Sequence, residues 1–184
     1  MKKIIGTLVT LEHATKEAID TLYYWKYEDP TQEAKKWNAP YIREELVSKQ
    51  TYQNQWNEEI SAGVPAALVI KSEQEVIGYV GAYWVDWHTQ WLETGIVIYD
   101  PSFWGGGYGT EAYQLWIDFL FSTTELHRLG MSTWSGNKRM MKAAQKTGMV
   151  EEARIRKARV VDGVYFDAIK MGILREEWEG KTTY

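Results

Sequence analysis

The sequence predicts a single domain of mixed α/β structure, in which a mostly antiparallel sheet is flanked by helices. Three consecutive segments, 65–71, 76–85 and 91–99, are rich in apolar and β-branched residues and are joined by short polar turns, which is typical of an antiparallel meander. Strand and helix patterns alternate further on, which places helices on the faces of a mixed sheet. The 184 residues contain no linker, repeat or low-complexity segment, so we expect one domain over residues 1–184.

One strand and two helices are expected before the meander. Residues 7–13 read as a strand, and residues 15–26 have helical periodicity with Thr15 as the N-cap. The prolines within residues 28–40 indicate an irregular loop. The pattern of residues 41–61 predicts a second, longer helix.

The second half of the chain is expected to alternate helices and strands and to end in a hairpin. The dipeptide Asp162-Gly163 between two β-rich segments is a strong signal for a two-residue hairpin turn. The predicted elements are a helix at 110–121, a strand at 127–134, a helix at 138–146 and strands at 150–161 and 164–173.

Composition excludes several classes of function. The net charge of −4 disfavours a nucleic-acid-binding protein, which usually has a surplus of basic residues. The absence of cysteine excludes thiol nucleophiles, disulfides and cysteine-ligated metals, and the three histidines have no metal-ligand spacing. No apolar run of about 18 residues is present, so we expect no membrane partner and a cytoplasmic location.

A glycine-rich segment between a predicted strand and a predicted helix carries the strongest functional signal. Residues 103–112 read FWGGGYGTEA. Glycines let the backbone approach an anion closely, and the N-terminus of a helix presents free N–H groups. We therefore expect a phosphate-containing ligand at this loop.

The known phosphate-binding loops fit this segment unequally. A P-loop is excluded because no lysine follows the glycines. The dinucleotide fingerprint is formally matched by Gly107, Gly109 and Ala112. However, the loop does not open a β-α-β unit, and no strand with an acidic end follows it. A nucleotide-binding or dinucleotide-binding enzyme is therefore the weaker alternative.

Four motifs occur in order along the chain. They are LETGIVI at 92–98, WGGGYGTEA at 104–112, Asn137 followed by Lys146-Thr147-Gly148-Met149, and GVYFD at 163–167. Together they resemble the GNAT superfamily of N-acetyltransferases, and most closely its RimJ/RimL-like branch. The resemblance implies a splayed sheet with the pantetheine arm of coenzyme A between strands 91–99 and 127–134. It also implies direct transfer of acetyl from acetyl-CoA to a primary amine in a ternary complex.

The resemblance assigns much of the cofactor site to backbone groups. The second half of strand 91–99 would bind pantetheine and polarise the thioester carbonyl, and the glycine loop would hold the pyrophosphate. Trp104 stands where Gln or Arg is usual, so we expect its indole to pack. The expected cofactor-binding residues are Ile96, Val97, Ile98, Trp104, Gly105, Gly106, Gly107, Tyr108, Gly109, Thr110, Asn137 and Lys142.

The helix at 138–146 begins with cations, which the helix dipole disfavours at that end. Lys138, Arg139 and Lys142 lie in its first turns. A bound coenzyme A phosphate would remove the penalty, and a solvated basic face is the alternative. Asn137 suits an N-cap, and the family also places an Asn here beside the cofactor.

Glu93 and Ser135 are the expected catalytic residues. Attack on a thioester needs a neutral amine, and a carboxylate in a partly apolar cleft can take its proton. In several members of the family a Glu at the position of Glu93 has this role, and a surface or salt-bridged Glu is the alternative. Many members carry a Tyr as general acid where this chain has Ala144. Ser135, near the cofactor strand, is the substitute that we consider.

The expected function is therefore acetyl-CoA-dependent N-acetylation of a protein N-terminus or a small amine, without a metal. A non-catalytic protein that binds or senses acyl-CoA is the alternative from another class. Analogy with the branch also suggests a homodimer.

Overall fold

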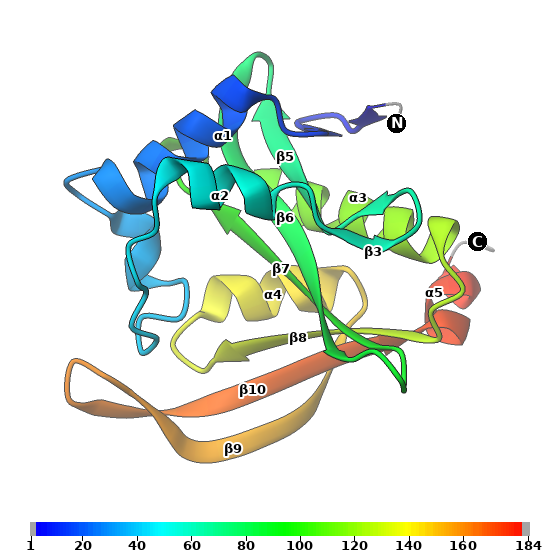
Figure 1. Cartoon of the computed structure of the whole chain (residues 1–184). Helices are drawn as coiled ribbons and strands as arrows, with labels where there is room; N and C mark the ends of the chain where they lie inside the picture. Colours follow the sequence, from blue (N-terminus) through cyan, green and yellow to red (C-terminus); the bar gives the residue numbers. More distant parts are fainter. Residues whose placement is uncertain (1–2, 182–184) are drawn as a thin grey trace.

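One sheet organises the part of the chain, residues 3–181, that the computed structural model describes; the ends of the predicted 1–184 domain lie outside it. Eight strands of this part form the sheet in the order β1-β2-β5-β6-β7-β8-β10-β9 (Figure 1). Neighbouring strands are antiparallel except β7 and β8, which are parallel. The predicted mixed, mostly antiparallel sheet is thus confirmed.

The strands vary from two to twelve residues. Two short ones, β3 (Glu59–Ser61) and β4 (Val64–Pro65), pair with each other outside the main sheet. The main sheet contains β1 (Ile4–Ile5), β2 (Thr10–Glu12), β5 (Ala67–Ser72), β6 (Glu75–Asp86), β7 (Trp91–Ile98), β8 (Arg128–Trp134), β9 (Val150–Val161) and β10 (Val164–Leu174).

The parallel pair at the centre of the sheet is short and opens into a gap. Only Leu92 with Leu129 and Glu93 with Gly130 are paired between β7 and β8. Beyond these residues the two strands diverge (Figure 1). The second half of β7 therefore has a strand partner on its β6 side only, and its other backbone groups need a different partner.

Helices lie on both faces of the sheet (Figure 1). The first face packs against the first two α-helices through Val69, Val97 and Tyr99, and the second face packs against α3 and α4. The α-helices are α1 (Lys16–Tyr23), α2 (Lys49–Gln55), α3 (Tyr108–Thr123), α4 (Lys138–Lys146) and α5 (Arg175–Lys181). The shorter turns are a π-helix η1 (Tyr24–Glu28) and 3₁₀-helices η2 (Glu33–Lys36) and η3 (Pro101–Phe103).

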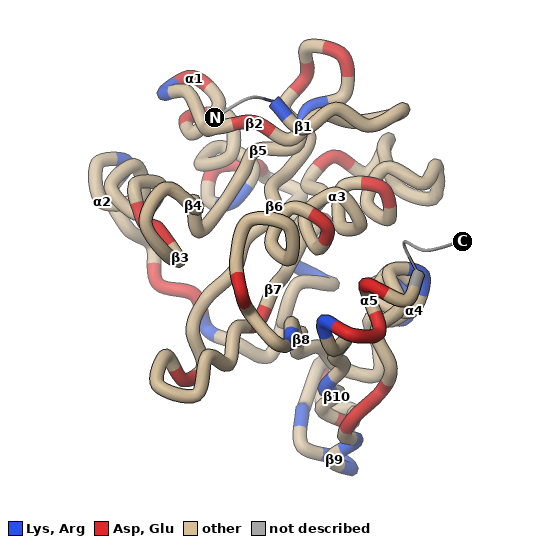
Figure 2. The backbone as a smooth tube through the Cα atoms, turned by 90° about the vertical axis from the view of Figure 1, so that its right-hand side faces the viewer, with Lys and Arg blue, Asp and Glu red and all other residues tan. Residues whose placement is uncertain are grey.

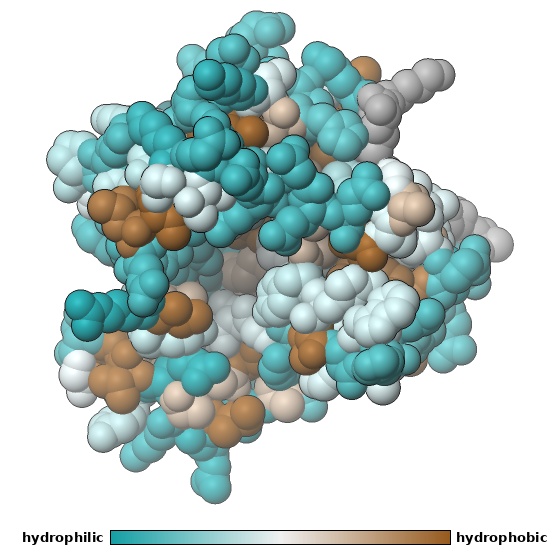
Figure 3. Space-filling model, in the orientation of Figure 1, coloured by the Kyte–Doolittle hydropathy of each residue, from teal (hydrophilic) through white to brown (hydrophobic). Residues whose placement is uncertain are grey.

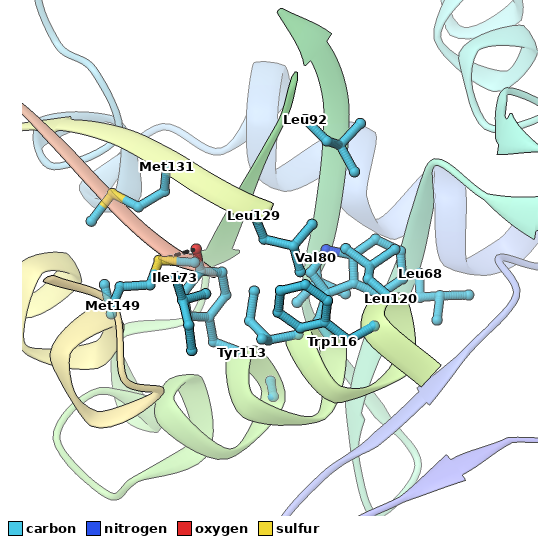
Figure 4. Close-up of a cluster of buried hydrophobic side chains, with 14 of the residues drawn as sticks. Leu68, Val80, Leu92, Tyr113, Trp116, Leu120, Leu129, Met131, Met149 and Ile173 are labelled. Carbon is cyan, nitrogen blue, oxygen red and sulfur yellow. Dashed lines mark hydrogen bonds between the residues drawn. The ribbon is translucent and has the colours of Figure 1, made fainter. Parts of the chain in front are cut away.

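The helix α3 is fixed to the sheet by large buried side chains (Figure 4). Trp116 is fully buried and its Nε1 donates to the Gly81 carbonyl at 3.1 Å. The Tyr113 hydroxyl lies 2.7 Å from the Thr94 hydroxyl of β7. Burial of two aromatic side chains contributes several kcal/mol. These contacts hold the start of α3, and hence the glycine loop, in a fixed position beside β7.

The predicted helix over residues 41–61 is wrong in most of its length. Only α2 is helical, and residues 59–61 form a strand. Ser48 caps α2, since its Oγ accepts from the Thr51 N–H at 3.1 Å. The Val47 carbonyl accepts from the buried Tyr23 hydroxyl at 2.8 Å, which ties the preceding segment to α1. This tertiary contact overrides local helix propensity.

Other local predictions are confirmed in detail. Thr15 caps α1 by accepting from the Ala18 N–H at 3.2 Å. Both α4 and β9 have the predicted bounds. Asp162 and Gly163 have φ values of 51° and 77°, as the predicted hairpin turn requires. The strand β1 and the helix α5 were not predicted.

Candidate functional site

A cleft of about 320 Å³ lies beside the second half of β7. Its walls come from β7, the glycine loop with the start of α3, the helix α4, and the loop around η2. Three lining residues are cations and none is a carboxylate, so the cleft suits an anionic ligand. It is lined by Ala34, Trp37, Asn38, Ile96, Val97, Ile98, Phe103, Trp104, Gly105, Gly107, Gly109, Thr110, Asn137, Arg139, Met140, Lys142, Ala143 and Lys146.

The backbone of β7 offers hydrogen-bonding groups to this cleft. The Tyr99 N–H donates to the Ile77 carbonyl at 2.8 Å, which sets the alternation of the antiparallel β6–β7 ladder. By that alternation the backbone N–H and C=O groups of Val97 bond to β6, whereas those of Ile96 and Ile98 point toward the gap. The Ile98 carbonyl accepts from the Trp104 Nε1 at 2.9 Å. The N–H groups of Ile96 and Ile98 are thus positioned to meet a ligand.

The glycine loop ends in a helix N-terminus without a side-chain cap. Gly107, the N-cap of α3, has φ 95°, and no side chain caps the helix. Gly105 has φ 85°, and a Cβ atom there would meet no atom within 4 Å. The first N–H groups of α3 therefore remain available to an anion. Gly106 and Tyr108 are not among the lining residues: the Tyr108 ring packs on Phe103, with centroids 5.1 Å apart.

Two indole rings enclose the guanidinium of Arg139. The Arg139 Cζ lies 4.1 Å from the ring centroid of Trp37 and 4.2 Å from that of Trp104. Burial lowers the pKa of Arg139, but an arginine stays charged at neutral pH. Lys142 and Lys146 also line the cleft from α4. The predicted packing role of Trp104 is therefore accompanied by a cation–π contact.

Trp37 lies in a loop that is fastened to the opposite wall. Its carbonyl accepts from the Trp134 Nε1 at 3.0 Å and from the Asn137 Nδ2 at 3.1 Å. The Asn137 Oδ1 accepts from the Met140 N–H at 3.1 Å, which confirms the predicted cap of α4. Asn137 lines the cleft, yet both ends of its amide already bind protein groups. Its contact with a cofactor stays a prediction.

Glu93 lies on the other face of the sheet from α3 and does not line the cleft. Its side chain is 2 % exposed and forms an ion pair with Lys170, Oε1 to Nζ at 2.5 Å. Its Oε2 accepts from the Tyr83 hydroxyl at 2.8 Å and from the Ser132 hydroxyl at 2.5 Å. Burial alone would raise the Glu93 pKa, but the three donors outweigh it and lower that pKa. Glu93 is therefore an ionised, paired carboxylate at neutral pH.

The other candidate for catalysis, Ser135, belongs to the end of the β8–β10 ladder. Its Oγ accepts from the Asp167 N–H at 3.0 Å, and its own N–H donates to the Asp167 carbonyl at 3.0 Å. It is not among the lining residues, so its role as an acid is a prediction without support from these contacts. Ala144, at the position where many relatives carry Tyr, is fully buried, and Ala143 lines the cleft instead.

Several residues of the site were not predicted. Lys170, Ser132 and Tyr83 meet Glu93 from three other strands, β10, β8 and β6. A lysine between buried apolar residues of a strand was the available signal, because such a lysine needs a carboxylate partner. Nothing in the local sequence of Trp37 indicates its contact with Arg139.

The sheet, its gap and the loop at the start of α3 define an acyltransferase-type scaffold, and the sequence supports the same class. Residues 9–150 match the acetyltransferase (GNAT) domain family. The chain belongs to this family. None of the helices in the described part of the chain is long and apolar enough to span a membrane.

Curated relatives are similar over part of their length. YdaF of Bacillus subtilis, whose name proposes a ribosomal N-acetyltransferase, is 27 % identical over 119 residues, which is 65 % of this chain and 63 % of YdaF. The N-acetyltransferase p20 of Bacillus licheniformis, named as uncharacterized, is 27 % identical over 114 residues, 62 % of this chain and 64 % of p20. The chain thus matches less than two thirds of these relatives.

Solved structures share the fold at low sequence identity. A spermidine N-acetyltransferase from Vibrio cholerae, in complex with CoA and spermine, has a TM-score of 0.74 and 19 % identity, covering 95 % of this chain and 99 % of that one. RimL, a ribosomal L7/L12 alpha-N-protein acetyltransferase in complex with coenzyme A, has a TM-score of 0.73 and 15 % identity, covering 94 % and 98 %. These likenesses show the fold; the RimJ/RimL-like branch stays a prediction.

Proposed function

We propose that this chain is an acetyl-CoA-dependent N-acetyltransferase that acts on the primary amine of a protein N-terminus or a small molecule. One observation carries the proposal: a single cleft joins the unpaired edge of β7 to an uncapped helix N-terminus and three cations. A pantetheine amide needs strand-like partners, and a pyrophosphate needs N–H groups and cations. Coenzyme A presents both groups on one molecule.

The residues divide the work of binding. The N–H groups of the glycine loop, from Gly105 to Thr110, would hold the pyrophosphate, and Arg139, Lys142 and Lys146 would neutralise phosphate charge. The N–H groups of Ile96 and Ile98 would bind the pantetheine and face the oxygen on which charge develops. Acetyl-CoA supplies the activated thioester.

Proton transfer involves the hydrogen-bonded cluster around Glu93. The amine nitrogen bonds to the acetyl carbon as the carbon–sulfur bond breaks, the ammonium loses a proton, and the thiolate gains one. Ser132 is exposed and hydrogen-bonded to Glu93, so it offers a proton relay from the solvent-exposed surface to that carboxylate. Because its pKa is lowered, Glu93 is a weak base. We therefore propose that Glu93 orients Ser132 and that water is the principal acceptor of the proton.

The test begins with binding of acetyl-CoA, coenzyme A, NAD and ATP by calorimetry. We expect micromolar-range affinity for acetyl-CoA and coenzyme A but not for NAD or ATP, and a loss of at least tenfold in Gly105→Ala, where a methyl group enters the cleft at φ 85°. Gly63→Ala is the matched control, because Gly63 has φ 79° and equally open surroundings outside the cleft. Equal effects of the two substitutions would refute the phosphate loop.

Release of thiol with amine acceptors then tests catalysis. Binding of acetyl-CoA without release of thiol in the presence of any amine would favour a non-catalytic acyl-CoA sensor. Ala144 at the Tyr position, with its buried methyl group, allows that alternative. Affinity for NAD or ATP with none for acetyl-CoA would instead favour a nucleotide-binding enzyme.

A further inference from the structure

The face of the sheet around Glu93 is a distinct surface that the cofactor cleft does not use. Strand alternation and register place the side chains of Glu93, Ser132, Lys170 and Phe166 on the same face. In Figure 3 the surface is hollowed between the part over α1 and α2 and the part over the β9–β10 hairpin. We call this surface the acceptor face, and it comprises Tyr41, Tyr83, Glu93, Ser132, Trp134, Arg159, Phe166 and Lys170.

Three carboxylates on and around the acceptor face have cationic partners. Glu93 is paired with Lys170 at 2.5 Å and Glu152 with Arg128 at 2.6 Å. Glu44, near Tyr41 in the sequence, lies 3.4 Å from Lys26. A polyamine needs carboxylates that have no other cationic partner. This surface offers it none among these residues.

Arg159, by contrast, is a cation on this surface without a carboxylate partner among the described residues. Its guanidinium lies over the Tyr41 ring, with Cζ 4.6 Å from the centroid, and one nitrogen donates to the Ala158 carbonyl at 3.1 Å. Its Nε is shielded from solvent without a hydrogen-bond partner, and no ion pair joins Arg159 to a carboxylate of the described residues. A buried donor of this kind calls for an anionic acceptor.

The surroundings of Arg159 extend the positive charge. Residues 153–161 contain four cations and no Asp or Glu, and of these cations Arg154 is paired with Glu151 and Asp167. Lys and Arg segments lie along this hairpin at the bottom of Figure 2. Arg159 also pairs with Phe166 of the acceptor face across the β9–β10 ladder. Arg159 therefore borders the acceptor face directly.

We propose that Arg159 recognises a carboxylate on the acceptor, so that the substrate is an amine that also carries negative charge rather than a polyamine. This inference rests on the proposed N-acetyltransferase function. The carboxylate can belong to a free amino acid or to an acidic side chain near a peptide N-terminus. Tyr41 holds the guanidinium in place through a cation–π contact, and the terminal N–H groups of Arg159 are the donors that would meet the carboxylate.

The experiment compares matched acceptors in a thiol-release assay. The peptides Ala-Glu-Glu amide and Ala-Gln-Gln amide differ in charge alone, alanine and alanine amide test the free carboxylate, and spermidine tests the polyamine. We expect roughly tenfold or more preference in kcat/KM for one charged member over its neutral partner, and little turnover of spermidine. The charged member that is preferred identifies the source of the carboxylate.

Variants connect the preference to Arg159. In Arg159→Gln we expect the KM of the charged acceptor to rise roughly tenfold, with kcat and the neutral acceptor nearly unchanged. Arg156→Gln, an exposed cation on the same strand, is the control and should behave as the parent protein does.

Two results would overturn the inference while acetyl-CoA still binds. One is equal or better turnover of spermidine, and the other is an unchanged charge preference in Arg159→Gln. Loss of acetyl-CoA binding to the parent protein would instead refute the proposed function. If turnover is undetectable, calorimetry measures the affinity of the same acceptors for the coenzyme A complex. Equal affinity for the charged and neutral members would refute the role of Arg159.

Discussion

Removing Lys170 should destabilise the protein more than removing the negative charge of its partner, Glu93. Lys170→Met leaves a carboxylate that is 2 % exposed without a cation. Breaking a buried pair in this way costs about 3–5 kcal/mol. Lys170 is 36 % exposed and Tyr83 and Ser132 still donate to the carboxylate, so water and these donors reduce the cost to about 2 kcal/mol. Glu93→Gln leaves a lysine that water can reach, and should cost about 1 kcal/mol.

Urea unfolding of both single variants and the double variant measures this asymmetry. We expect the double variant to be more stable than the sum of the single effects predicts, with a coupling of about 1 kcal/mol. Lys36→Met is the control, because the Lys36–Glu33 pair at 2.6 Å is exposed and should contribute about 0.5 kcal/mol or less. Equal costs of the two single substitutions, or no coupling, would refute the interpretation of Glu93 as a paired buried carboxylate.

The stabilisation that the ionised Glu93 carboxylate provides should fall as the pH is lowered. The pKa of Glu93 is lowered in the folded protein, so its stabilisation is fully present above the ordinary carboxyl pKa of about 4.3. It is lost as the pH falls through the lower folded value. The difference in unfolding free energy between the parent protein and Lys170→Met should therefore shrink in acid.

Three further predictions concern other sites. Arg139→Ala should shift the tryptophan fluorescence and weaken coenzyme A binding about fivefold or more. Arg139→Lys should retain much of the affinity, because it keeps the charge, but should still shift the fluorescence. An unchanged spectrum in Arg139→Ala would refute the contact with the two indole rings. Glu111→Gln should lower stability by about 1–2 kcal/mol in urea unfolding at pH 7, because the carboxylate accepts three backbone N–H groups of residues 7–9. The lowered pKa of Glu111 makes this loss smaller in acid. Glu93→Gln should reduce kcat about tenfold or less, and a reduction beyond about a hundredfold with loss of the acidic limb of the pH–rate profile would restore Glu93 as the principal base.

Local signals in the sequence predicted the parts of the site that depend on the backbone. Gly107 and its neighbours lie at a helix N-terminus as expected, and Asn137 caps the next helix. The turn at Asp162-Gly163 was also predicted, because only a few residue types tolerate positive φ there. These features require contacts over a few residues, which a single sequence carries.

The remaining parts depend on contacts between distant segments. The Lys170–Glu93 pair joins residues 77 positions apart, and the Trp37–Trp134 hydrogen bond joins residues 97 apart. The failed helix over 41–61 has the same origin, since its first half is held by a side chain of α1. Local propensity contains no information about which distant strand or loop is adjacent.

The carbonyl of Trp37 has a mechanical consequence for the molecule. The two halves of the sheet are joined at β7–β8 by only two residue pairs, so contacts outside the strands help to hold the two sides of the gap together. The Trp37 carbonyl makes such contacts, because it accepts from Trp134 and Asn137 at once. A loop that contributes no strand to the sheet thus bridges the two walls of the cleft, and changes in that loop can alter the fit of a ligand while every strand stays intact.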